Sequence, residues 1–157
     1  MGLGLFYAML GAATAAFLGG YGSSIGIGIA GSAANGVLSE KPEKFGTMLL
    51  LVALPGTQGI YGFLTAFLII LKVQLLTGTP LDISPIAGLQ ILASALPVGI
   101  AGFGSGVFQG KVCAAGIAVA AKKPEASMKA LVYAAMVETY AVLGLVISYF
   151  LLNGVKL

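Results

Sequence analysis

The chain has 157 residues, of which 59% are hydrophobic and only 8% are charged, whereas an ordinary soluble domain carries about 25% charged residues. This length permits one domain, so the apolar excess cannot be placed in a large core and must face lipid. The composition excludes an ordinary soluble domain and predicts an integral membrane protein.

The residue types that are absent or rare exclude several kinds of site. The sequence has no histidine, no arginine, no tryptophan and only one cysteine. A zinc cluster, a disulfide framework and a Ser-His-Asp triad are therefore excluded. The net charge of +3 comes from scattered lysines without interleaved aromatic residues, which argues against nucleic acid as a partner.

Prolines and charges divide the chain into four apolar stretches. They cover approximately residues 3–38, 46–76, 86–121 and 127–153. Each exceeds the roughly 20 residues that cross a bilayer, so we predict an all-α fold with four transmembrane helices in a single membrane domain, residues 1–157. Residues 1–10 lack the basic segment that begins a cleaved signal peptide, so the first stretch is predicted to be retained.

The lysines predict an orientation, because basic loops stay on the cytoplasmic side. They gather at the first and third connections, and the middle connection has none. These lysines are Lys41, Lys44, Lys122, Lys123 and Lys129. We predict that loops 39–45 and 122–126 are cytoplasmic and that both termini are extracellular.

The sequence also repeats itself at an offset of 82 residues. Residues 41–43, Lys-Pro-Glu, recur at 123–125, and Gly-Ser at 22–23 recurs at 104–105. We therefore predict a duplicated helical hairpin, with repeats at residues 3–76 and 86–153 in the same orientation.

Small residues recur every fourth position in the first helix of each repeat. The stripes are Gly20, Ser24, Gly28, Ser32 and Gly36, and Gly102, Gly106, Gly110, Ala114 and Ala118. Such stripes allow close approach of helices within a membrane. They predict that first helices pack against one another, as in a closed assembly of identical subunits; the alternative is packing within one chain only.

One acidic residue, Glu138, lies inside an apolar helix. An ionised carboxylate at the bilayer centre costs roughly 2.5 to 3.5 kcal/mol, and such groups are functional by default. Counted from the repeated loops, Gln58 and Gln109 lie at the same depth, about 20 Å from one membrane face. We therefore predict that these polar groups meet at one level.

Two more polar residues, Thr57 and Tyr61, share the helix of Gln58. Together these residues offer carboxylate, hydroxyl and amide oxygens, which suit a hard cation, and Pro55 frees main-chain oxygen nearby by lacking an N–H. A proton needs only the carboxylate, so the additional oxygens favour Na⁺.

Each of these residues also has a structural interpretation. The glutamines can act as interhelical hydrogen-bond donors and acceptors, Thr57 can bond to its own helix, and Tyr61 can serve packing alone. Lys111 lies at a similar depth and could pair with Glu138, but it points away if Gln109 faces the site.

The segment Gly26–Gly31 fits a dinucleotide fingerprint as a string of letters, but it lies inside a membrane helix and follows no strand. We therefore expect no nucleotide site and no enzymatic activity in this chain, so that any ATP chemistry resides on other subunits.

Three segments, residues 54–62, 108–112 and 137–140, resemble the rotor-ring proteolipid (c/K subunit) of V-type ATPases, particularly the bacterial sodium-translocating type. The likeness covers nearly the whole chain. It implies a homo-oligomeric ring in the bacterial cell membrane, with first and third helices inside. It further implies that one Na⁺ is bound by the residues Leu54 (carbonyl), Thr57, Gln58, Gln109 and Glu138, with Tyr61 hydrogen-bonded to the carboxylate.

The resemblance also implies partners. A stator membrane subunit supplies an arginine to the emptied carboxylate, a central-stalk subunit binds the cytoplasmic loops, and lipid surrounds the ring. Two alternatives stay open: a proton-translocating ring, and a structural or pore-forming membrane proteolipid without a rotary partner.

Overall fold

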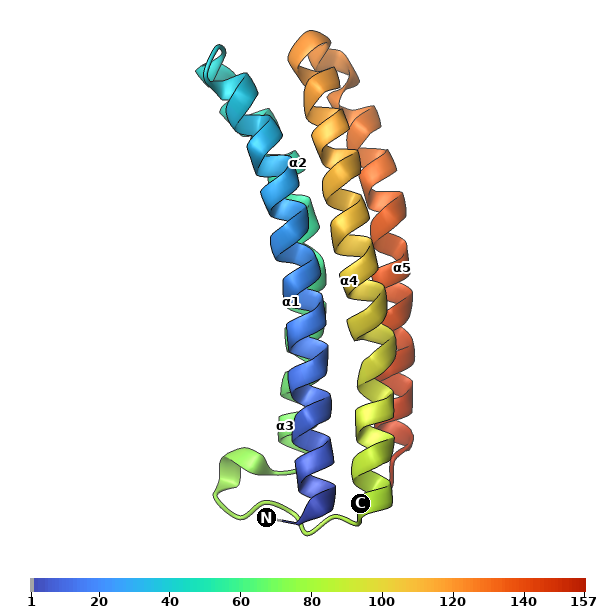
Figure 1. Cartoon of the computed structure of the whole chain (residues 1–157). Coiled ribbons are helices and arrows are strands. Elements are labelled where there is room, and N and C mark those ends of the chain that lie inside the picture. Colours follow the sequence, from blue (N-terminus) through green and yellow to red (C-terminus); the bar gives the residue numbers. More distant parts are fainter. Residues whose placement is uncertain (1) are drawn as a thin grey trace.

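The computed structural model describes residues 2–157 and contains four long helical segments (Figure 1). In chain order the elements are α1 (Leu3–Leu38), η1 (Pro42–Lys44), α2 (Phe45–Ala53), η2 (Leu54–Gly56), α3 (Thr57–Lys72), η3 (Leu75–Thr77), α4 (Pro85–Lys122), η4 (Pro124–Ala126) and α5 (Ser127–Gly154). The four segments are each long and apolar enough to cross a membrane, so the predicted all-α fold is confirmed.

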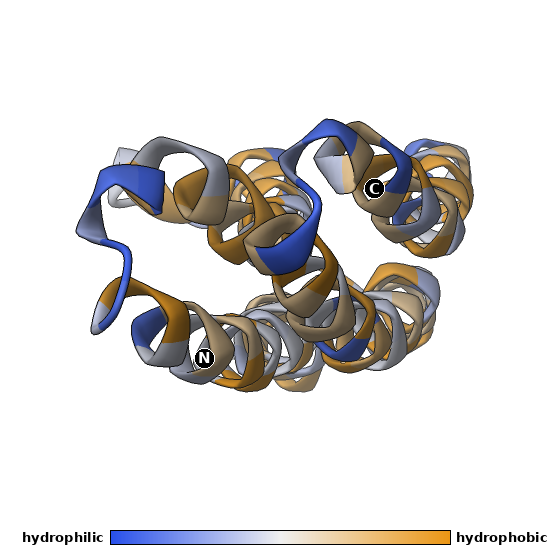
Figure 2. Cartoon of the chain, turned by 90° about the horizontal axis from the view of Figure 1, so that it is seen from above, coloured by the Kyte–Doolittle hydropathy of each residue, from blue (hydrophilic) through white to orange (hydrophobic). Residues whose placement is uncertain are grey.

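Local sequence determines where these segments begin. Pro42, Pro85 and Pro124 each stand at the start of a helical element. At this position a backbone N–H would have no partner within the helix, so the N–H that proline lacks costs no hydrogen bond. Ser84 precedes α4, and its side chain accepts a hydrogen bond from the Ala87 N–H, which is a standard N-cap. Figure 2 shows apolar residues along all the long helices, and many large apolar side chains, such as Phe63 and Phe150, are exposed in the chain, as lipid contact requires.

The two hairpins lie side by side. α1 packs against α4, while α1 also contacts α3 of its own hairpin and α4 contacts α5. Both termini lie at one end of the molecule, and the turns around residues 39–44 and 122–126 lie at the other (Figure 1). The two repeats therefore run in the same direction.

Glycine allows the close approach of α1 and α4. A methyl group placed at Gly106 would lie only 2.6 Å from the carbonyl carbon of Gly22, so any larger side chain would push the helices apart. Gly102, Gly106 and Gly110 are all buried. Packing within one chain therefore accounts for these three glycines of the second predicted stripe.

The first stripe behaves differently. A side chain placed at Gly20, Gly28 or Gly36 would meet no atom within 4 Å in the described part of the chain. Ser24 and Ser32 are likewise exposed. No other helix of the same chain therefore packs tightly against the first stripe.

Two apolar clusters fill the interior, and a polar layer lies between them. One cluster, toward the termini, includes Leu5 and Ile91; the other, toward the turns, includes Met48 and Leu51. The predicted polar residues lie at the level between these clusters.

Candidate functional site

The second helical segment is interrupted at the level of the polar layer. Pro55 lies in the 3₁₀ turn η2, between α2 and α3, because it cannot donate to the carbonyl four residues earlier. At this turn the Thr57 hydroxyl donates to the Leu54 carbonyl over 3.1 Å. Thr57 thus bonds to its own helix, as the structural interpretation expected, but its oxygen keeps acceptor capacity.

The remaining predicted residues form one hydrogen-bond network across three helices. The Gln58 side-chain N–H group (Nε2) donates to Oε1 of Gln109 over 2.5 Å. Nε2 of Gln109 donates to Glu138 Oε2 over 3.3 Å and to the Ala134 carbonyl over 3.0 Å. The Tyr61 hydroxyl donates to Glu138 Oε1 over 2.7 Å. Both oxygens of the carboxylate therefore have a donor from a neighbouring helix.

The network leaves one polar atom unpartnered. Gln58 is 0% exposed, and its Oε1 atom is the only buried side-chain nitrogen or oxygen among residues 2–157 that lacks a hydrogen-bond partner. Burying an unpaired amide oxygen costs roughly 1 to 3 kcal/mol. A cation next to Glu138 would supply the missing partner, so the donor set fits a hard cation.

Sequence reasoning missed one member of the network, Ser105. Its hydroxyl accepts from Gln58 Nε2 over 3.0 Å and donates to the Val137 carbonyl over 3.0 Å, while the side chain is only 6% exposed. The two N–H bonds of Gln58 are therefore both used, on Ser105 and Gln109. The recurrence of Gly-Ser at 22–23 and 104–105 singled this position out, but the repeat alone does not indicate its contact.

Lys111 does not join the network. The residue is exposed, and its ammonium lies 5.2 Å from the centroid of the Phe108 ring, a cation–π contact on the surface of α4. Glu138 thus stays paired with neutral donors, as the orientation argument predicted.

Comparison with known proteins identifies the family of this four-helix chain. The sequence matches the family of ATP synthase C subunits twice, over residues 10–69 and 92–151. The chain belongs to this family. The two matches are offset by 82 residues, which confirms the duplicated hairpin.

Two subunits of rotary ATPases are similar in sequence to this chain over nearly its whole length. V-type sodium ATPase subunit K of Enterococcus hirae is 49% identical over 148 residues, which cover 94% of this chain and 91% of that protein. A-type ATP synthase subunit K of Methanocaldococcus jannaschii is 40% identical over 151 residues, 96% of this chain and 64% of that protein. The resemblance to V-type ATPase proteolipids is confirmed.

Proposed function

We propose that this chain is the rotor-ring subunit of a V-type ATPase and carries Na⁺ across the membrane on Glu138. The observation that carries the proposal is the orphaned Gln58 Oε1, which belongs to the same hydrogen-bond network as a carboxylate already held by two donors. The similarity to a subunit named for a sodium ATPase supports the same ion. The chain itself is a non-catalytic subunit, and ATP hydrolysis belongs to other subunits of the complex.

The ligand set that we propose consists of oxygen atoms only. They come from Leu54 (main-chain carbonyl), Thr57, Gln58, Gln109 and Glu138. Tyr61 supports the carboxylate by its hydrogen bond. A monovalent cation and one carboxylate sum to zero charge, whereas a divalent cation would leave a net positive charge in the hydrocarbon, which is costly. Charge balance therefore favours a monovalent ion.

Charge balance also explains transport. The loaded site is neutral and can pass lipid as the ring turns, whereas the emptied Glu138 needs a counter-ion. A stator membrane subunit that carries an arginine would supply it. Each ion moved across the membrane exchanges about 2.3 kcal/mol per 100 mV of potential.

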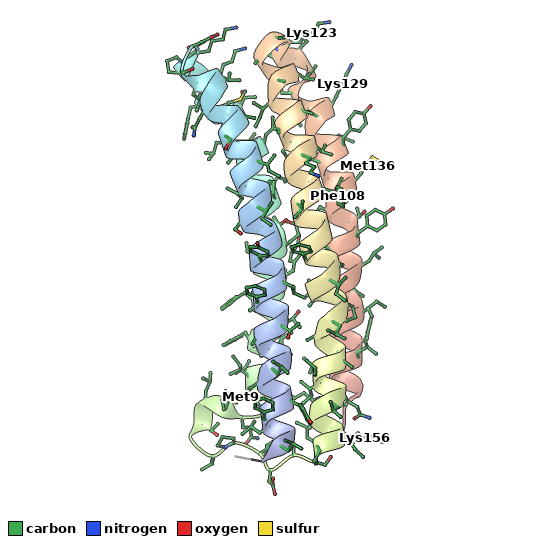
Figure 3. The ribbon with its side chains drawn as sticks, viewed as in Figure 1. Met9, Phe108, Lys123, Lys129, Met136 and Lys156 are labelled. Carbon is green, nitrogen blue, oxygen red and sulfur yellow. The ribbon has the colours of Figure 1, made fainter. Side chains whose placement is uncertain are left out.

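In the cell we propose a multi-pass protein of the bacterial membrane, assembled as a ring of identical copies in contact with lipid. Loops 39–45 and 122–126 would be cytoplasmic and the termini extracellular. Figure 3 shows Lys123 and Lys129 near the end that carries the turns and Lys156 at the opposite end. The excess of basic residues at the turns supports this orientation.

The cytoplasmic turns are the proposed contact for a central-stalk subunit. Lys41, Lys122 and Lys123 are exposed there. Lys44 has another role, because its ammonium donates to the Ala120 and Ala121 carbonyls at the end of α4. Replacing the three exposed lysines should abolish co-purification of the stalk subunit, and retention of the stalk would refute this contact.

The ion is tested by carbodiimide labelling of Glu138 in the assembled complex at neutral pH. Added NaCl should slow labelling, whereas N-methylglucamine chloride at the same ionic strength should not. The Glu138→Gln variant, which cannot be labelled at this site, gives the background. Unchanged labelling in sodium would refute the sodium site and favour the proton-translocating ring.

The same preparation tests the remaining alternative. A structural or pore-forming proteolipid would purify as free oligomers that never co-isolate with soluble ATPase subunits. A rotor ring should co-isolate with them in a complex that hydrolyses ATP.

A further inference from the structure

The helix α3 begins at the level of the polar layer without a capping side chain of its own. Its N-cap residue is Gly56, which makes no side-chain hydrogen bond. The first N–H groups of a helix have no partner within that helix, and the side chain of the N-cap residue ordinarily accepts from one of them. Water does not replace this partner within a bilayer. The start of α3 therefore needs an acceptor from another helix.

Ser23 of α1 is that acceptor. The Gly59 N–H donates to Oγ of Ser23 over 2.8 Å, and Ser23 is only 5% exposed. Gly59 is the third residue of α3, and the N–H at this position is one that an N-cap side chain ordinarily binds. Ser23 thus caps α3 although it lies on a different helix.

Close packing of α1 on α3 keeps Ser23 within reach of this N–H. The two helices lie side by side (Figure 1). A methyl group added at Gly19 would lie 2.7 Å from the carbonyl oxygen of Gln58, and one added at Gly59 would lie 3.3 Å from Oγ of Ser23. The first distance is well below van der Waals contact. Glycine at these positions therefore permits the short helix separation on which the Ser23–Gly59 hydrogen bond depends.

The capped end of α3 carries much of the proposed ion site. Thr57 and Gln58 are the first two residues of α3 and immediately precede Gly59. The Leu54 carbonyl accepts from both the main-chain N–H and the hydroxyl of Thr57. Three of the proposed oxygen ligands therefore belong to the short segment that ends at the Ser23 hydrogen bond.

The second repeat shows that the duplicated serines act on different groups. The counterpart of Ser23 is Ser105, which accepts from the side chain of Gln58 and donates to the Val137 carbonyl. α5 contains no proline and is continuous from Ser127 to Gly154, so no helix begins at this level in the second hairpin. Ser105 is therefore available for the Gln58 amide, whereas Ser23 binds the main chain of α3.

We propose that Ser23 is a positioning residue of the ion site. It fixes the first helical turn of α3 and, through that turn, the oxygens of Leu54, Thr57 and Gln58. Ser23 acts through the Gly59 N–H and is not itself a ligand. Without its hydroxyl the first turn of α3 loses its cap, and the three oxygens are no longer held at fixed separations. This inference rests on the ion site of the proposed function.

Hydrogen exchange in the assembled complex tests the cap. Ser23→Ala should raise the exchange rate of the amides in residues 57–62 about fivefold, the factor that corresponds to the typical loss of one helix cap. Ser148→Ala is the matched control, because Ser148 accepts the Val98 N–H over 3.0 Å beside Pro97 of α4, about 15 Å along α5 from Glu138. It should leave exchange in residues 57–62 unchanged. Unchanged exchange in Ser23→Ala would overturn the cap.

Sodium protection of Glu138 from carbodiimide tests the positioning role. The NaCl concentration that halves labelling should rise about fivefold in Ser23→Ala, by the same loss of one cap. Ser148→Ala also removes a buried acceptor of a main-chain N–H, so it should lower the midpoint of thermal unfolding similarly, yet it should leave the sodium requirement unchanged. Faster exchange in Ser23→Ala without a rise in this concentration, or an equal rise in Ser148→Ala, would overturn the positioning role.

A second variant keeps the test open if Ser23→Ala does not fold. Ser23→Cys retains a side chain of similar size, and sulfur is only a weak acceptor, so exchange and the sodium requirement should change in the same direction. The outcomes separate this inference from the proposed function. Absence of sodium protection in the unsubstituted protein would refute the sodium site itself, whereas sodium protection that neither Ser23 variant alters would refute only the role of Ser23.

Discussion

Replacement of Ser105 by alanine tests how the site holds Gln58. The two N–H bonds of the Gln58 amide go to Ser105 and Gln109, so Oε1 must face the remaining side, where it has no protein partner. Ser105→Ala removes one of the two contacts that hold this orientation. The amide can then rotate and present N–H instead of oxygen, which disfavours a cation.

The expected loss of sodium affinity follows from the single hydrogen bond that Ser105→Ala removes. A neutral hydrogen bond contributes about 1 kcal/mol, which corresponds to a factor of about five in affinity. The sodium concentration that halves the rate of carbodiimide labelling at Glu138 should therefore rise about fivefold. Labelling in the absence of sodium should be unchanged, because Ser105 does not contact the carboxylate.

Two controls separate this positioning role from general destabilisation. Ser148→Ala also removes a buried serine, which accepts from the Val98 N–H away from the site, and it should leave sodium protection unchanged. In a Gln58→Ala background, Ser105→Ala should add nothing, because the group it orients is gone. An equal shift in both backgrounds, or no shift in the single variant, would refute the reasoning.

Three further substitutions have defined outcomes. Tyr61→Phe removes a hydrogen bond to the Glu138 carboxylate, and hydrogen bonds to charged groups contribute about 1.5 to 3 kcal/mol. The sodium concentration that halves carbodiimide labelling of Glu138 should therefore rise about tenfold or more. An unchanged concentration would contradict the role of the hydroxyl. Lys44→Ala removes the ammonium that donates to the last carbonyls of α4, and it should lower the free energy of unfolding by about 0.5 to 1 kcal/mol. This loss should appear as a lower midpoint of thermal unfolding in detergent, whereas Lys41→Ala should leave that midpoint unaltered. Gly106→Leu would force α1 and α4 apart and should cost about 1 to 3 kcal/mol or more; normal thermal stability of that variant would show that the close approach is not required.

Much of this fold could be predicted because its signals are local and strong. Long apolar stretches bounded by Pro42 and Pro124 define helices by length alone, and the 82-residue offset defines the duplication. The polar level was predictable from helical rise, since Gln58 and Glu138 stand at similar distances from the repeated turns.

The unpredicted features depend on side-chain direction across helices. Depth alone cannot show that Ser105, rather than another serine, meets the Gln58 amide. Nor does lysine placement distinguish exposed Lys41 from Lys44, which caps α4 in the other hairpin. The glycine stripes look equivalent in sequence, yet Gly106 is buried and Gly28 is exposed, because Gly106 packs against Gly22 of α1 and a side chain at Gly28 would meet no atom within 4 Å in the described part of the chain.

The loss of a carboxylate from the first repeat has a consequence for gearing. Each chain contributes four membrane helices but, with the proposed site, only Glu138 would carry an ion, because Gly56 occupies the equivalent position in the first repeat. A rotor of given circumference built from such chains moves half as many ions per revolution as one with a carboxylate on every hairpin. The same torque per revolution can therefore drive each ion against about twice the membrane potential, at about 2.3 kcal/mol per 100 mV. With one carboxylate for every two hairpins, such a rotor would move fewer ions per turn, each against a steeper gradient.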